Sequence, residues 1–241
     1  MNFRNETYRA PFAWEAILRW LGARAIPGIE RVDDDVYRRG RVRASHDGVA
    51  VITNGARTRI RRLFDLDADP AAIAAVLGRD PMLGPLLARL PGVRVPGAWD
   101  PFELAVRAIV GQQVSVAGAR TLLGRIAARC GGLSAERLAD AEIDGMPRKR
   151  AETIRHLARA VIAKEIDLAR DDLTRVSGIG PWTASYIALR LGDADAFPAG
   201  DLVLRRHAGN LTPRELEKKA ERWRPFRGYA AMLLWTGGSG R

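Results

Sequence analysis

Residues 173–190 read LTRVSGIGPWTASYIALR, and this stretch carries the most information about the fold. Gly178 and Gly180 flank one apolar residue, Ile179, between two segments with amphipathic helical spacing. Glycine tolerates positive φ and lets another backbone approach closely. Pro181 suits the first turn of the second helix, whose leading N–H groups lack partners within the helix. The pattern predicts a hairpin of two helices, which either grips a phosphate without reading sequence or forms an ordinary helical corner.

The charge balance favours a phosphate-bearing partner. Lys and Arg total 39 against 28 Asp and Glu in 241 residues, a net charge of +11, and only four of the 39 are Lys. A strongly basic chain is typical of proteins that bind polyanions, nucleic acid first. An Arg-rich codon pool would give the same composition, so charge alone does not decide between the two explanations.

Several classes of protein are excluded by residue counts. The single cysteine, Cys130, rules out an intramolecular disulfide, a Cys-x-x-Cys zinc site and a four-thiolate iron–sulfur cluster. The three histidines are far apart, with no His-x-x-x-His spacing. Neither a long apolar run nor a basic-then-apolar leader is present, so we expect a cytoplasmic protein without a membrane partner.

Residues 1–90 are expected to form a small α+β domain. Trp14, Ile17, Leu18 and Leu21 have the spacing of a helix over residues 12–21. Residues 37–60 are β-like and contain two hairpin turn pairs, at 47–48 and 54–55, which predict two or three antiparallel strands. A helix is expected over 63–77, and the four prolines between 81 and 96 are typical of a linker.

Residues 91–241 are expected to be entirely helical, with seven or eight short helices. Asp100, Pro101 and Glu103 form a helix start, and the apolar spacing that follows predicts one buried stripe. Further starts are expected at Ser115, Ser134, Pro147 and Thr212. Stops are expected at Gly111, Gly131, Gly145 and Gly192. The fold class is therefore α+β, an antiparallel sheet with helices followed by an all-α domain that contains the hairpin.

The hairpin resembles the helix-hairpin-helix of the DNA glycosylase superfamily, whose signature continues into a Gly/Pro-rich turn that ends in aspartate. Here that turn is residues 195–201, DAFPAGD. The closer resemblance is to bacterial 3-methyladenine DNA glycosylase II, the AlkA type. Residues 11–24 resemble the start of that family, and four further segments resemble it in the same order: 109–117 (IVGQQVSVA), 145–152 (GMPRKRAE), 178–186 (GIGPWTASY) and 220–230 (AERWRPFRGYA). The likeness covers nearly the whole chain.

The resemblance implies an enzyme that flips alkylated purines, such as 3-methyladenine and 7-methylguanine, out of duplex DNA and hydrolyses the N-glycosidic bond. Asp201 matches the catalytic aspartate, beside a sugar that gains oxocarbenium character. Asp is also a common helix N-cap, and the two roles are compatible at this position. Asp195 is a weaker candidate for catalysis.

The resemblance also implies an aromatic base pocket, because alkylated purines are cationic and ring faces attract cations. Its matching positions are Trp182, Tyr186, Trp235, Trp20 and Leu202. Core packing is the alternative for each ring, and Trp99 and Trp223 are expected to be structural. Leu202 and Thr236 stand where the best-known relative has tyrosines, so the range of lesions is left open.

DNA contacts are implied at two further places. Gly178, Gly180 and Thr183 match the phosphate-binding hairpin, where the family holds a monovalent cation, Na⁺ or K⁺, on backbone carbonyls that correspond to Thr174, Val176 and Gly178. Gln112 and Gln113 are expected to project from the surface after the helix that ends near Val110. Gln113 occupies the position of the leucine wedge in the best-known relative. It would fill the gap left by the flipped base, or else be a solvated surface amide.

The expected activity needs no cofactor and involves no lyase step. Bifunctional relatives carry a nucleophilic lysine two residues after the second hairpin glycine, where this chain has Trp182. We therefore expect a monofunctional enzyme, monomeric, with alkylated double-stranded DNA as its partner. Two other interpretations are kept: a non-catalytic protein of the same fold that binds alkylation damage, and a bifunctional lyase.

Overall fold

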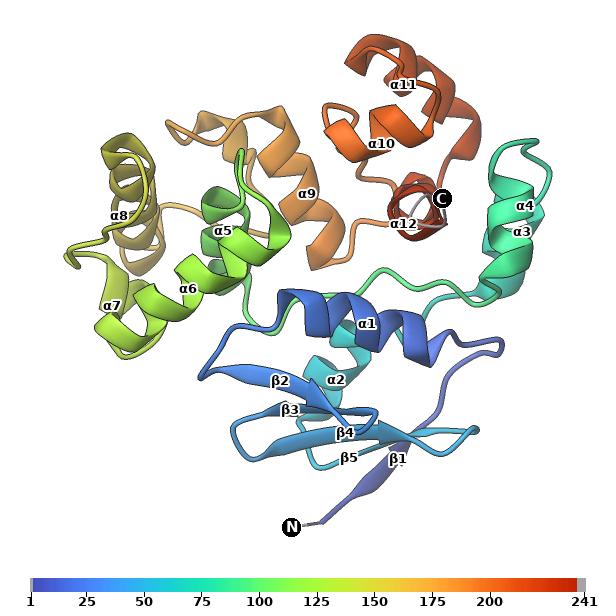
Figure 1. Ribbon diagram of the computed structural model, residues 1–241, viewed down its shortest axis with the longest axis horizontal. Coiled ribbons are helices and arrows are strands. Elements are labelled where there is room, and N and C mark those ends of the chain that lie inside the picture. The colour runs from blue at the N-terminus through green and yellow to red at the C-terminus, as the bar shows by residue number, and fades with distance from the viewer. Residues whose placement is uncertain (1, 238–241) are drawn as a thin grey trace.

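A computed structural model describes residues 2–237, and Figure 1 shows a sheet at one end of the molecule with helices stacked above it. Five antiparallel strands form the sheet in the order β1-β5-β4-β3-β2. Their bounds are Arg4–Glu6 (β1), Glu30–Asp33 (β2), Val36–Arg39 (β3), Val42–His46 (β4) and Val51–Thr53 (β5). Helix α1, Trp14–Arg24, lies across this sheet and contacts β2 and β3.

The prediction of two or three antiparallel strands over residues 37–60 is confirmed, and two edge strands that the sequence analysis did not predict lie outside that region. The region 37–60 supplies β3, β4 and β5, while β1 and β2 add the two edges. Both edge strands are short and charged, with the sequences RNE and ERVD, so they lack the alternating apolar pattern that indicates a strand. Their carboxylates Glu6 and Glu30 are nevertheless buried, because arginines from other elements pair with them.

Two segments after the sheet also differ from expectation. The helix expected over 63–77 is two helices, α2 (Arg57–Leu63) and α3 (Pro70–Leu77), and the Asp69 carboxylate caps the second. The segment expected to be a linker contains α4, Leu83–Arg89. Its N–H groups at Met82 and Leu83 donate to Asp80, whose other carboxylate oxygen accepts from the buried Trp223 indole. The contact between Asp80 and Trp223 thus helps to fix the start of α4, in a segment whose prolines are typical of a linker.

The second half of the chain is helical, as predicted. Its eight α-helices within the described residues are α5 (Pro101–Val110), α6 (Val116–Cys130), α7 (Ala135–Leu138), α8 (Arg148–Ile162), α9 (Pro181–Leu191), α10 (Leu202–His207), α11 (Pro213–Ala220) and α12 (Arg227–Gly237). The expected side-chain caps are present at Asp100, Ser115 and Thr212, the last as a capping box with Glu215. Among the helices of residues 2–237, none has the length and apolarity needed to cross a membrane.

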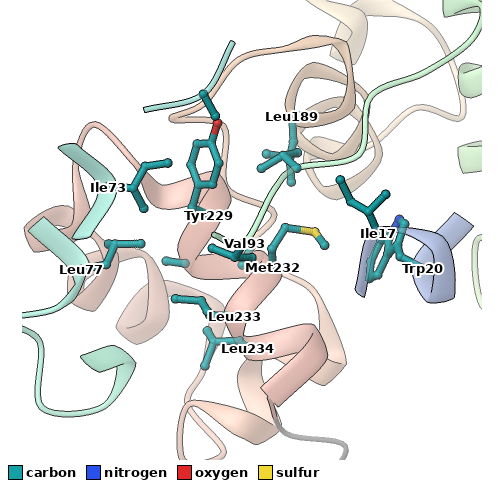
Figure 2. Close-up of a cluster of buried hydrophobic side chains, with 14 of the residues drawn as sticks. Ile17, Trp20, Ile73, Leu77, Val93, Leu189, Tyr229, Met232, Leu233 and Leu234 are labelled. Atoms are coloured by element: carbon teal, nitrogen blue, oxygen red, sulfur yellow. The ribbon is translucent and has the colours of Figure 1, made fainter. Parts of the chain in front are cut away.

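Buried side chains form two clusters. One lies among helices α5 to α9. The other joins the N-terminal elements to the C-terminal helices α10, α11 and α12. In Figure 2, Tyr229, Met232, Leu233 and Leu234 of α12 lie between Ile73 and Leu77 of α3 on one side and Leu189 of α9 with α1 on the other. The end of the chain therefore packs back onto its beginning, while the domain boundary expected between residues 90 and 91 stays a prediction.

A quartet of buried charges joins the sheet to the helical half. Arg39 of β3 and Arg107 of α5 each donate hydrogen bonds to both Glu30 of β2 and Glu103 of α5. Burial by itself raises the pKa of Glu103, but the two guanidinium groups outweigh this effect and hold that pKa below its usual value. The Glu103 side chain therefore serves this network between the sheet and α5, while its backbone N–H donates to the Asp100 cap.

Glu103→Ala should lower the free energy of unfolding by about 3–5 kcal/mol, because it leaves two buried guanidinium groups with only the Glu30 carboxylate. Denaturant unfolding followed by circular dichroism measures the loss. The matched control is Glu152→Ala, which removes an exposed pair with Arg148 and should barely move the midpoint. Similar midpoints for the two variants would show that the quartet does not hold the two halves together.

Candidate functional site

Asp201 accepts four hydrogen bonds at the N-terminus of α10. Its Oδ1 accepts from the N–H groups of Val203 and Leu204, at 2.9 and 3.0 Å, so the carboxylate is a helix N-cap. The Trp235 indole Nε1 also donates to Oδ1, at 3.1 Å, and the Trp182 indole Nε1 donates to Oδ2, at 3.0 Å. The same carboxylate thus caps α10 and accepts hydrogen bonds from two indole rings. Helices α9, α10 and α12 therefore meet at Asp201, which is half-buried.

The four predicted pocket rings lie together. Trp182 and Tyr186 are one turn apart on α9 and stack nearly parallel, with ring centroids 5.6 Å apart. Trp235 of α12 meets the edge of Tyr186 at 6.1 Å and lies 5.4 Å from Trp20 of α1. These rings and Asp201 line a cavity of about 450 Å³, a size within the range of small-molecule sites. The four rings form an aromatic wall of the cavity, and they come from three helices that are far apart in the sequence, α1, α9 and α12.

Two arginines that the sequence analysis did not single out also line the cavity. Arg190 donates to the Tyr186 hydroxyl at 2.8 Å and to the carbonyls of Pro96 and Gly97. The Arg24 guanidinium lies 3.3 Å from the centre of the Trp20 ring. Burial by itself raises the pKa of Tyr186, but Arg190 and Arg24 outweigh it and leave that pKa below its usual value. Both arginines follow a pocket ring by four residues, a helical spacing that would have drawn attention to them.

Several other residues differ from their expected places. Leu202 is 54% exposed and does not line the cavity, whereas its neighbour Val203 does. The reason is that α10 begins at Leu202, which turns successive side chains by about 100°. Trp99, expected to be structural, lines the cavity, and Arg39 and Arg59 lie over its ring. Trp223 is fully buried, as expected.

Asp195 lies at the start of the same turn as Asp201 but has other partners. Its carboxylate pairs with Arg224 and Arg227, and it is not among the residues that line the cavity. The Thr236 hydroxyl donates to the Met232 carbonyl within α12, at 2.6 Å, and also lies outside the cavity lining.

The hairpin forms with a shorter first arm than expected. A single 3₁₀ turn, Leu173–Arg175, replaces the helix expected before the glycines, and α9 begins at Pro181 as predicted. Ile179 is buried, while Gly178 and Gly180 on either side are exposed. The backbone φ of Gly178 is +92°, and a Cβ there would overlap the Thr153 hydroxyl of α8. Gly180 has open space around it.

The two glutamines after α5 have different environments. The Gln112 amide donates to the Gly178 carbonyl at 3.1 Å and to the buried Thr183 hydroxyl at 2.9 Å, so the prediction that it projects from the surface was wrong. Gln113 is exposed, as predicted, and has a φ of +59°. Gln112 thus joins the loop to the hairpin by two hydrogen bonds, and the next residue, Gln113, is the exposed one.

The carbonyl groups expected to hold a monovalent cation are partly engaged. The Val176 carbonyl accepts from the Ile179 N–H at 3.0 Å, and the Gly178 carbonyl accepts from Gln112. A carbonyl oxygen has two lone pairs, so each can still offer one to a hard cation. The residues fit such an ion, and the site stays a prediction. Among residues 2–237, no group of three or more His, Cys, Asp or Glu side chains is placed to hold a metal.

Two family models match this chain. Residues 5–58 and 41–100 match the family model of the AlkA N-terminal domain, and residues 106–225 match that of the HhH-GPD superfamily base excision DNA repair proteins. The chain is 34% identical to DNA-3-methyladenine glycosylase 2 of Escherichia coli, over 95% of each chain. This chain belongs to the AlkA-type HhH-GPD family.

Other relatives of this AlkA-type chain include a longer protein and more distant structures. It is 40% identical, over 95% of its length, to a probable bifunctional transcriptional activator/DNA repair enzyme AlkA of Mycobacterium tuberculosis, and it spans about half (55%) of that protein. Its fold matches the 3-methyladenine DNA glycosylase of Archaeoglobus fulgidus with a TM-score of 0.84, at 23% identity over 98% of both chains. It also matches the 8-oxoguanine glycosylase/lyase of Clostridium acetobutylicum, solved with double-stranded DNA, with a TM-score of 0.77 at 17% identity over 99% of both chains.

Gly178→Ala should lower the free energy of unfolding by about 1–3 kcal/mol, because a side chain at positive φ is strained and its Cβ would displace Thr153. Gly180→Ala should leave stability nearly unchanged, since its φ is −87° and no atom stands in the way. Thermal unfolding of the two variants side by side provides the measurement. Equal tolerance of both changes would contradict the close contact between the hairpin and α8.

Proposed function

We propose that this protein is a monofunctional DNA glycosylase that removes alkylated bases from duplex DNA. The observation that carries the proposal is the Asp201 carboxylate, which lies beside an aromatic cavity and is held there by the N–H groups of two of its rings. A base turned out of the stack would enter the cavity, and its sugar would then lie next to Asp201. The enzyme would act as a monomer and would require no cofactor for hydrolysis.

The chemistry follows from the charge of Asp201. When the N-glycosidic bond breaks, its electron pair leaves with the base and the sugar gains oxocarbenium character. A fixed carboxylate next to the sugar stabilises this positive charge and can orient the water that bonds to the sugar carbon. The four donors around Asp201 fix its position before the reaction, so little reorganisation is needed in the transition state.

The aromatic wall supports alkylated purines as substrates. N3- and N7-alkylated purine nucleotides carry a positive charge, and the electron-rich face of an aromatic ring attracts a cation. Trp182 and Tyr186 stack on one another, while Trp20 and Trp235 add two further rings. A cavity of about 450 Å³ is large enough for one flipped base.

Water is the nucleophile in this proposal. The four lysines of the chain, Lys149, Lys164, Lys218 and Lys219, are all absent from the cavity lining, and Trp182 occupies the position of the nucleophilic lysine in bifunctional relatives. A Schiff base with the sugar requires such an amine. Trapping with borohydride should therefore yield no covalent complex with DNA.

The hairpin and the loop beside it supply the DNA contacts. Gly178 and Gly180 are exposed, so a phosphate can approach their backbone closely. Gln112 joins the hairpin to the loop, and Gln113 would enter the space that the base leaves. The net charge of +11 adds attraction to the duplex that does not depend on sequence.

Asp201→Asn should reduce base excision by about 10²–10³-fold, because it removes the negative charge and retains an oxygen that can cap α10. Release of bases from methylated DNA, resolved by chromatography, measures the effect. The matched control is Asp193→Asn, which loses the same charge where the carboxylate accepts two backbone N–H groups of a turn outside the cavity lining. Near-normal excision by Asp201→Asn would refute the catalytic assignment. Absence of excision by the unaltered protein would favour the non-catalytic damage-binding alternative.

Gln113→Ala should weaken binding to a duplex with an abasic-site analogue about 5–30-fold, which corresponds to the roughly 1–2 kcal/mol of a lost side-chain hydrogen bond and its packing. Binding to undamaged duplex should barely change, because no gap exists there. Fluorescence anisotropy with the two duplexes provides both constants. Equal losses on the two duplexes would mean that another side chain fills the gap, and Gln113→Gly should match the alanine variant because it also lacks the amide.

A further inference from the structure

The sheet has an open face, which points away from the helices and is called the outer face below. Helices α1 and α2 lie on one side of the sheet in Figure 1, and no helix of residues 2–237 covers the other side. Tyr37 of β3 and Ala44 of β4 are fully buried beneath the helices. Successive side chains of a strand point to opposite faces, so the next residue of β3 and the preceding residue of β4, Arg38 and Arg43, point to the outer face.

Three arginines stand side by side on the outer face. Arg31 of β2 is paired in the strand register with Arg38 of β3, which is paired in turn with Arg43 of β4. Neighbouring strands are about 4.8 Å apart, so this arginine row is roughly 10 Å long. Like charges directly opposite one another destabilise a sheet. The row therefore costs stability that a single carboxylate among the three positions would have restored.

The protein compensates only part of the charge of the arginine row. Asp33 pairs with both Arg31 and Arg38, at 2.9 Å in each case. Arg31 is still 70% exposed, and Arg43 is exposed and forms no ion pair within residues 2–237. The turn between β3 and β4, next to the row, adds the exposed Arg41. Four positive charges thus stand against one negative charge at this end of the sheet.

The phosphates of duplex DNA fit the outer face. Arginine side chains bind phosphates without reading sequence, and the phosphates of a strand form a regular line of negative charge. A single strand would instead need aromatic rings on which its bases stack, and β2, β3 and β4 place no aromatic side chain on this face. The chain belongs to a family of DNA repair proteins, so duplex DNA is present where it works.

We propose that the outer face of the sheet is a second duplex-binding surface, which holds a DNA segment other than the one at the hairpin. Helix α1 packs on the inner face of the sheet and lines the cavity, so it stands between the two surfaces. One molecule would then hold two segments at once and move from one to the other without release into solution. The proposal does not depend on the catalytic role of Asp201.

The test begins with a complex in which the hairpin and the cavity are occupied. The protein is mixed with one equivalent of a donor-labelled duplex that contains an uncleavable abasic-site analogue, and an undamaged, acceptor-labelled duplex is then titrated in at low salt. Energy transfer between the labels requires both duplexes on the protein, whereas displacement of the first duplex gives none. The logarithm of the second binding constant should fall against the logarithm of salt concentration with a slope of about −2 to −3, because each phosphate contact contributes about −0.9.

Arg43→Glu is the decisive variant, because it reverses one charge and places a carboxylate opposite Arg38. An opposite-charge pair across two strands stabilises a sheet, so the melting temperature should not fall. Affinity for the second duplex should drop at least tenfold. Arg31→Gln, which removes one charge, should reduce the salt slope by about 0.9.

The matched control is Arg79→Glu, which makes the same change of charge at an exposed arginine between α3 and α4 that forms no ion pair within residues 2–237. It should keep the second affinity within threefold of the original. Absence of energy transfer with the unaltered protein, or equal losses for Arg43→Glu and Arg79→Glu, would refute the proposal. An oligoglutamate peptide that displaces the second duplex at equal concentration of charge would assign the face to acidic proteins and would also refute it.

Base excision separates this inference from the proposed function. At saturating protein, Arg43→Glu should release bases from methylated DNA within twofold of the original rate, because the outer face does not touch the flipped base. A fall in excision that matches the loss of the second duplex would place Arg43 at the first site and overturn the inference. If the unaltered protein excises nothing, the proposed function fails, while energy transfer still decides whether the second surface exists.

Discussion

The four hydrogen bonds to Asp201 are the constraint on which the rest of the site depends. A carboxylate beside an aromatic wall loses solvation, so it must be surrounded by donors. The amides at the start of α10 supply two, and the indoles of Trp182 and Trp235 supply the others. Because an indole donates through one N–H only, the two rings are fixed in orientation as well as in position. The aromatic cavity and the carboxylate are therefore one structure.

This arrangement explains why the last helix packs on the first part of the chain. Trp235 reaches Asp201 only if α12 lies alongside α10, and α12 is held there by apolar side chains that face α3, α4 and α1. Trp20, on the helix α1 that packs on the sheet, lies next to Trp235 in the cavity wall. The sheet itself contributes through Glu30 and Arg39, whose pairs with Arg107 and Glu103 join it to α5, another helix that lines the cavity.

The hairpin and the glutamine loop are joined in a similar way. Gln112 bonds both to the hairpin backbone and to Thr183 on α9, the helix that also carries Trp182. A phosphate held at the hairpin, a side chain inserted at Gln113 and a base in the cavity would consequently share one rigid frame. Precise positioning of this kind is what a reaction that relies on a fixed charge requires.

The sequence by itself determined much of this protein. The glycine spacing at 178–180 predicted the hairpin, the caps at Asp100, Ser115 and Thr212 predicted where helices begin, and the family pattern predicted that Asp201 and four rings belong together. These features depend on local backbone chemistry or on motifs, and both can be read along the chain. Only the tertiary structure decided the remaining features. These are the edge strands β1 and β2, helix α4, the hydrogen bonds of Gln112, and the two arginines of the cavity, Arg24 and Arg190. Each of them depends on partners far away in the sequence: buried carboxylates that need arginines, an aspartate that needs an indole, and guanidinium groups whose role is set by the ring or carbonyl beside them.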